Sequence, residues 1–286
     1  MPFDFLVDAL ISTFLALALL CIGLSASLGD MLGLLQDRTR LFPALAANVL
    51  CAPLVALLLV WLIPMEPAAA TVLLLLAFLP GGINAVQFST KAPGQLATAG
   101  ELLIVLSVIS LLLAPFAAQL LLEPEGPLSL PWSRLLLRVG VFMLLPLLLG
   151  MWIRARAPAW AEKLYKPAML ISTLCFIASV VISLGLRQDA LGELGSGAAL
   201  AMLAFVVIMM AVGWFLGGPD PDSRQVLAVS TNLRNVGLAY VLVEDCCDDP
   251  LLAPAVLAYM AIMVTPNLLL TVGCGIARKR RLARAR

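Results

Sequence analysis

Apolar stretches of about 20 residues recur from one end of the chain to the other, and each is long enough to cross a membrane as a helix. The strict polar/apolar alternation of β-barrel strands does not occur. Only 12% of the residues are charged and the mean hydropathy is +1.05, so a soluble chain of 286 residues could not cover its surface with polar groups. The sequence therefore predicts an all-α polytopic membrane protein with one membrane domain over 1–286.

The stretches predict nine transmembrane helices, at about 6–28, 42–62, 70–91, 96–122, 133–153, 167–186, 196–216, 225–243 and 254–276. An odd number places the two termini on opposite sides of the membrane. When the sides are alternated along the chain, most basic residues fall on one side, together with the basic tail 277–286. Basic loops remain in the cytoplasm, so we expect a cytoplasmic tail, an external N-terminus and a bacterial inner (plasma) membrane.

Several chemistries are excluded by composition. The chain has no histidine, which excludes a histidine metal site, a Ser-His-Asp triad and a histidine proton relay. Cys246 and Cys247 are adjacent, which suits neither a zinc site nor a mutual disulfide. We therefore expect no cofactor and no confident metal site, with Na⁺ or H⁺ only as a coupling ion. The basic tail is interpreted as a topology determinant that touches lipid, not as a nucleic-acid site.

Two of the predicted helices are interrupted near their centres. In 70–91 the sequence Pro80-Gly81-Gly82 removes a backbone donor and lets the chain open. In 225–243 the polar run 230–235 is followed by Gly237. Unwound backbone at this depth is tolerated only where protein or a water-filled cavity surrounds it, so both breaks are expected inside the helix bundle.

The order of the predicted helices adds a symmetry. Helices two to four and seven to nine form two triplets, offset by five spans and therefore inverted in the membrane, and each has its interrupted helix in the centre. Paired interruptions in inverted repeats indicate a secondary transporter with its site at the midplane. The alternative is that both interruptions are helix kinks without a further role.

The motifs "PGGINAV", "STNLRNVGLA" and "LLCIGLSASLGDM" resemble those of the bile acid:sodium symporter family, and the resemblance covers nearly the whole chain. It implies two broken helices that cross, with substrate bound beside the crossing. It also implies a panel of helices 6–28, 133–153 and 167–186. The core would then contain the helices at 42–62, 70–91, 96–122, 196–216, 225–243 and 254–276.

The sequence departs from the sodium-coupled members of that family. Their second motif reads roughly Glu-x-Gly-x-Gln-Asn-x-Gly-Leu, and its Glu and Gln lie at sodium sites. Ser230 and Arg234 stand at those two positions here, while Asn235 is kept. The family's Ser-Asn after Pro-Gly-Gly matches Ala85-Val86 without a gap, or Asn84 with a short deletion. A fixed guanidinium repels Na⁺ and raises the cost of binding it.

Arg234 and Glu101 are the charged residues within predicted spans that call for an explanation. Arg234 lies too centrally to reach the interface, so it either anchors a substrate anion, replaces the coupling cation, or merely pairs with a carboxylate. Glu101 lies near the inner helix end, where water would reach it, or pairs with Arg234 and carries a proton. The candidate substrate-binding residues are Arg234, Asn235, Asn84 and Asn232. The ion-site equivalents are Ser230, Thr231, Ser107 and Glu101.

Asparagines at the breaks have two interpretations, because they can cap half-helices or contact substrate. Pro266 and Asn267 in the last helix are interpreted as a kink and the residue that satisfies it. Together these features predict a secondary transporter of a small organic anion, working by alternating access with weak or no sodium dependence, as a monomer or homodimer in the lipid bilayer. The alternatives are a sodium symporter with sites rebuilt from Ser230, Asn84, Ser107 and Glu101, an intramembrane enzyme, and a channel.

Overall fold

The computed structural model describes residues 2–25, 29, 34, 36–82, 93–122, 144–186, 188–247 and 249–284. Its regular elements are α1 (Pro2–Ser25), α3 (Arg38–Leu45), the π-helix η1 (Ala46–Cys51), α4 (Ala52–Leu62), α5 (Pro67–Phe78), α7 (Pro93–Leu121), α9 (Leu145–Arg156), α10 (Pro158–Leu186), α11 (Gln188–Leu216), α12 (Pro221–Asn232), α13 (Val236–Cys246), α14 (Leu252–Ile262) and α15 (Val264–Arg284). The described residues contain helices and no strands, which confirms the all-α prediction.

Seven helical stretches of the described chain are long and apolar enough to cross a membrane, and the shorter α5 is apolar as well. Large apolar side chains face outward; Trp61 and Phe215, for example, are each 80% exposed. Outward-facing apolar surface on this scale suits lipid and not water, so the protein is an integral membrane protein. Parts of three predicted helices, 26–28, 83–91 and 133–143, lie outside the described residues, and the count of nine stays a prediction.

The last predicted helix, 254–276, lies within one apolar helical stretch, Leu252–Arg281, which is kinked. α14 ends at Ile262 and α15 begins at Val264. Pro266 has no N–H to donate to the carbonyl of Ile262, and its ring clashes with that carbonyl. The kink expected from Pro266 is therefore present, one turn before the proline.

The prediction of an ordinary α-helix over 42–62 also needs correction. Helix begins at Arg38 and passes through the π-helical turn of η1, in which the N–H of Ala52 donates to Ala47. Pro53 follows directly and cannot donate to Val49 as an α-helix would require. Such π-turns are frequent at functional sites, and this one faces the site described below. The helix predicted at 167–186 likewise begins earlier, at Pro158.

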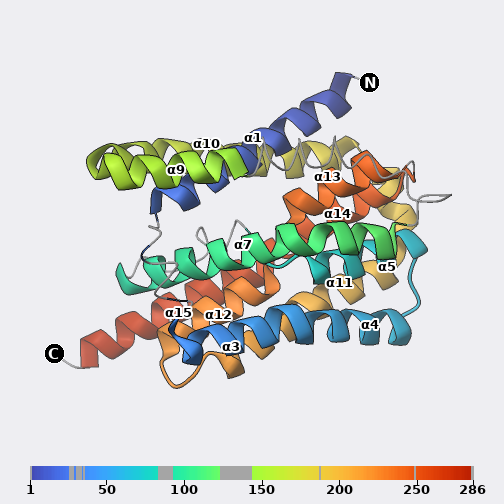
Figure 1. The fold of residues 1–286 in the computed structure, drawn as a ribbon. Coiled ribbons are helices and arrows are strands. Elements are labelled where there is room, and N and C mark those ends of the chain that lie inside the picture. Colours follow the sequence, from blue (N-terminus) through green and yellow to red (C-terminus); the bar gives the residue numbers. More distant parts are fainter. Residues whose placement is uncertain are drawn as a thin grey trace.

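Figure 1 shows α1 (blue) lying with α9 and α10, apart from α3, α4, α12 and α15. α1 and α9 approach closely because Gly23 and Gly150 face each other; a Cβ on Gly23 would lie 2.9 Å from the Cα of Gly150. Residues 225–243 of the broken stretch are all buried by the surrounding helices. α1, α9 and α10 are the helices assigned to the panel, and the division into panel and core stays a prediction.

Candidate ion and substrate site at the helix crossing

The two predicted interruptions meet in space. α5 ends at Phe78, and residues 79–82 are non-helical and buried; α12 ends at Asn232, and α13 begins at Val236. The N–H of Gly82 donates to the carbonyl of Leu233 over 2.9 Å, and the N–H of Asn235 donates to the carbonyl of Leu79 over 2.9 Å. Backbone groups released by one break are thus satisfied by the other, as an apolar surrounding requires.

The glycines of the first break are needed for this close approach. Gly81 has φ of +86°, and a Cβ there would lie 2.8 Å from the backbone of Leu106 and Ser107 on α7. A Cβ on Gly82 would lie 2.5 Å from the carbonyl carbon of Leu233. Pro80, Gly81 and Gly82 therefore lie in the crossing itself, where the sequence predicted a hinge.

Gly237 occupies a different place from the one its motif suggested. It lies within α13 and not in the non-helical segment. A Cβ on Gly237 would lie 2.5 Å from Cδ1 of Leu15, so this glycine lets α13 approach α1. It is a helix-packing position beside the crossing, and a hinge role for it stays a prediction.

Arg234 is the largest fully buried side chain of the described residues, with 0% exposure. Its Nη1 donates to Oδ1 of Asn48 over 2.9 Å, and its Nη2 donates to the carbonyls of Asn48 and Ala77, each over 3.3 Å. The guanidinium also lies 5.7 Å from the ring centre of Phe205, a cation–π distance. Arg234, which lies in the second break, is thus enclosed by η1, α5 and α11.

Both main-chain acceptors lack an ordinary helical donor. Ala77 lies in the last turn of α5, where carbonyls have no donor four residues on. In the register of η1 the carbonyl of Asn48 would need the N–H of residue 53, which is a proline. The guanidinium therefore supplies donors to two carbonyls that the helices leave open, at the negative end of a half-helix.

Asn48 is a site residue that sequence reasoning missed. Besides accepting from Arg234, it donates from Nδ2 to the carbonyl of Ala44 over 3.0 Å, and it is fully buried. The available signal was an asparagine in an otherwise apolar run, five residues before Pro53. Neither an asparagine nor a proline alone marks a site in a membrane helix, so Asn48 and Pro53 did not predict one.

The guanidinium of Arg234 donates its hydrogen bonds to neutral oxygens and not to a carboxylate. Among the described residues, no Asp or Glu lies within ion-pair distance of it. Glu101 is half-buried on α7, next to Leu102 of a cavity discussed below. Its pairing with Arg234 and its position at a wetted helix end both stay predictions.

Asn232 is fully engaged in holding the breaks together. It exchanges two hydrogen bonds with Asn267, of 2.6 and 3.1 Å, and its Nδ2 also donates to the carbonyl of Ala228. The hydroxyl of Tyr259 donates to the carbonyl of Asn232 over 2.7 Å, at the open end of α12. Asn267 thus ties the kink in the last helix to the second break, instead of satisfying its own kink alone.

Four buried polar groups near the crossing have no hydrogen-bond partner, and they belong to Arg234, Asn235 and two serines. The side chain of Asn235 caps α13 by accepting from the N–H of Leu238 over 3.1 Å, which fixes Oδ1 and leaves Nδ2 as the free donor. Nδ2 of Asn235, Nε of Arg234 and the hydroxyls of Ser107 and Ser110 are buried without a hydrogen-bond partner. Two of these four groups can only donate.

Ser230 and Thr231 bond back into their own helix. Both hydroxyls donate to the carbonyl of Leu227, Ser230 over 3.1 Å. Their oxygens retain acceptor capacity, but neither side chain contacts Arg234 through a hydrogen bond. Of the remaining predicted site residues, Asn84 lies outside the described residues.

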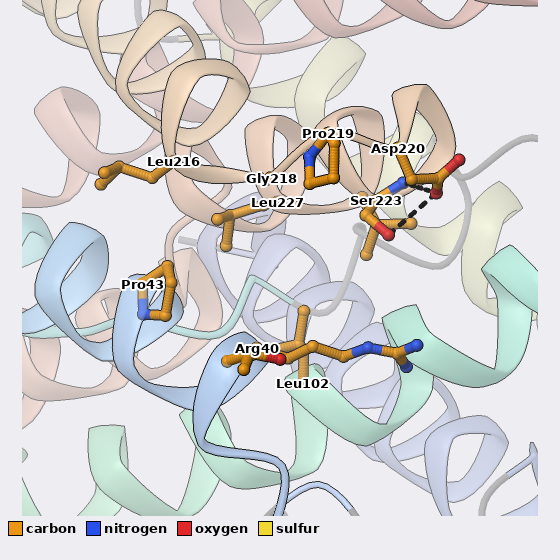
Figure 2. Close-up of a pocket in the computed structure, with 12 residues that line it drawn as sticks. Arg40, Pro43, Leu102, Leu216, Gly218, Pro219, Asp220, Ser223 and Leu227 are labelled. Atoms are coloured by element: carbon orange, nitrogen blue, oxygen red, sulfur yellow. Dashed lines mark hydrogen bonds between the residues drawn. The ribbon is translucent and has the colours of Figure 1, made fainter.

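Leu227 also lines a cavity of about 200 Å³ between α3, α7 and the start of α12. Figure 2 shows Arg40, Pro43 and Leu102 on one side, and Pro219, Asp220 and Ser223 on the other. The backbone N–H of Ser223 bonds the carboxylate of Asp220 over 2.8 Å and holds its pKa below the usual range. Leu227 lies one helical turn before Ser230 on α12, so the cavity ends about one turn from the crossing.

These features define a class of protein: a polytopic helical membrane protein in which two helix breaks meet around buried polar groups, an arrangement found in secondary transporters. The model of the Sodium Bile acid symporter family matches residues 12–194, and the chain belongs to this family. The family is one of transporters and not of enzymes, and membership indicates a membrane transporter of the bile acid or organic anion type. A comparison with curated proteins gives no match.

Proposed function

We propose that the protein is a secondary transporter of a small organic anion that works by alternating access with little or no dependence on sodium. The observation that supports this is the bonding of Arg234, whose fully buried guanidinium contacts neutral oxygens and no described carboxylate. A net positive charge therefore persists at the crossing. It attracts an anion and repels Na⁺.

The open hydrogen-bonding groups favour the same ligand. Nε of Arg234 and Nδ2 of Asn235 need acceptors, and the hydroxyls of Ser107 and Ser110 can also donate. A carboxylate or sulfonate supplies acceptor oxygens, whereas a sodium ion would leave the two obligate donors without partners. Asn235 is the proposed substrate contact; Asn232 is proposed as a structural cap, since its side chain is already engaged.

The proposed cycle moves two groups of helices against each other. α1, α9 and α10 form the panel, and the elements that carry the crossing form the core. Arg234 bonds to η1 and α5, both within the core, so the charge would travel with the core. The tail of α15 is assigned to the cytoplasm and the N-terminus to the outside.

A sodium symporter with rebuilt sites is the second candidate, because Ser107 retains an unpartnered hydroxyl and Ser230 retains acceptor capacity. Uptake and counterflow of bile acid anions into proteoliposomes separate the two. We expect saturable, counterflow-competent transport to persist when Na⁺ is replaced by K⁺ or choline. A steep, saturable requirement for Na⁺ would support the rebuilt sites instead, and flux without counterflow would indicate a channel.

A further inference from the structure

The surface of α15 is apolar up to Ile276 and basic from Arg278 onward. Its outward face carries exposed apolar side chains at Leu268, Leu269, Val272 and Ile276. Basic residues begin two positions later, at 278–281. With a rise of about 1.5 Å per residue, the first guanidinium-bearing Cα lies about 3 Å beyond the last apolar one along the helix axis. The basic residues therefore start where lipid tails give way to headgroups.

Two of these basic side chains lie beside α12 and remain partly exposed to solvent. Arg278 lies 3.9 Å from the carboxylate of Asp222, near the start of α12. Arg278 and Arg281 line a notch of about 60 Å³ together with Asp222 and Trp214. Two guanidiniums and one carboxylate leave the lining with a net positive charge, and the Arg278–Asp222 contact is long and partly exposed, so it holds Arg278 weakly.

We propose that this notch binds the phosphate of an anionic phospholipid headgroup, held by Arg278 and Arg281. Guanidinium groups present planar pairs of donors that match phosphate oxygens. The indole of Trp214 in the notch lining suits the interface between tails and headgroups, and the exposed side chain of its neighbour Phe215 offers an apolar surface for the acyl chains. A free anion would use only the notch, whereas a lipid would also use this apolar surface.

The site is coupled to the broken helix through Asp222. Lipid phosphate and the Asp222 carboxylate compete for Arg278, so lipid binding releases Asp222 from α15. α12 begins at Pro221 and ends at the crossing, 12 residues long in all. The lipid would therefore alter how firmly the first half of the broken helix is attached at its outer end, and this regulation does not depend on which anion is transported.

The test is a thermal-shift titration of the full-length protein in neutral detergent with phosphatidylglycerol, using phosphatidylcholine as the control lipid. We expect saturable stabilisation by phosphatidylglycerol alone. Arg278→Gln with Arg281→Gln should weaken the apparent lipid affinity at least tenfold more than the matched control does, because it also removes the charge-assisted hydrogen bonds to the phosphate. The matched control, Lys279→Gln with Arg280→Gln, removes the same charge from outside the notch and loses only the general attraction of basic residues to anionic lipid.

Two further measurements distinguish a defined site from general attraction. Asp222→Asn removes the competing carboxylate and should increase the affinity for phosphatidylglycerol. Inorganic phosphate at the same concentration should give no stabilisation, because it has no acyl chains to contact the apolar surface at Trp214 and Phe215. Equal losses in the two double variants, a weaker affinity in Asp222→Asn, or equal stabilisation by inorganic phosphate would each overturn the proposal.

Discussion

The substitution Asn48→Asp would remove the net positive charge around Arg234 but keep its hydrogen-bond acceptor, so it tests the two roles of Arg234 separately. The new carboxylate would lie where Oδ1 now accepts from Nη1 of Arg234 over 2.9 Å, so the acceptor remains while the net charge at the crossing falls to zero. The variant loses the hydrogen bond from Asn48 to the carbonyl of Ala44, worth about 1 kcal/mol. The bond to the guanidinium gains strength but costs desolvation, so we expect stability to change by less than about 2 kcal/mol.

The effect on anion binding should be much larger than the effect on stability. A carboxylate about 8 Å from a bound anion repels it by about 2 kcal/mol at an effective dielectric constant of about 20. That energy corresponds to an affinity about 30-fold weaker. The measurement is thermal stabilisation of the purified variant by a concentration series of bile acid anions, with counterflow in proteoliposomes as the functional readout.

Asn48→Ala is the control, because it removes the acceptor without adding a charge. It should lower stability by about 2–4 kcal/mol, the sum of one charge-assisted and one neutral hydrogen bond, while the protein that remains folded keeps most of its anion affinity. If Asn48→Asp binds anions as tightly as the unmodified protein, net positive charge at the crossing is not what attracts the substrate, and Arg234 has only a structural role.

Three other predictions test the crossing, the cavity and the topology. Gly82→Ala should destabilise the protein by about 3 kcal/mol or more, because its Cβ would meet the carbonyl of Leu233 at 2.5 Å; Gly273→Ala on α15, which meets nothing within 4 Å, should be neutral in the same unfolding assay, and equal losses would contradict the reasoning. Asp220, whose pKa lies below its usual value, should add stability that is fully present above the unfolded pKa of about 4 and is lost as pH falls through the lower folded value; a pH series with Asp220→Asn should show that this loss disappears. An impermeant thiol reagent should label Cys247 in intact cells, and labelling only after permeabilisation would contradict the predicted topology.

Much of the fold could be predicted because a lipid environment leaves few choices. A backbone in hydrocarbon must satisfy its own hydrogen bonds, so apolar stretches of sufficient length form helices. The first break was predicted from Pro80, Gly81 and Gly82, and the second from the polar run 230–235. What could not be predicted was the π-turn at 46–51, which contains Asn48, because the partner of Asn48 is Arg234, 186 residues away in the chain.

The site was predicted less completely, for a reason that the contacts make clear. Arg234 and Asn235 are conspicuous in an apolar sequence, and both lie at the crossing. Arg234 donates to the main-chain carbonyls of Asn48 and Ala77, and no side-chain pattern in the sequence indicates an open carbonyl. Asn232 was predicted beside substrate, but its amide is used by Asn267; only the packing of the last helix reveals that pairing.

A cation that is part of the protein has consequences that a bound sodium ion does not have. Sodium enters with the substrate and leaves with it, so its gradient supplies the driving force. The guanidinium of Arg234 is attached to η1 and α5 and must return with the empty carrier. On the proposed mechanism the loaded crossing is neutral and the empty one is positive. Because uncompensated charge in a membrane is costly, the empty form should reorient more slowly than the loaded form. Exchange of one anion for another would then be faster than net uptake, and the substrate's own gradient would set the direction.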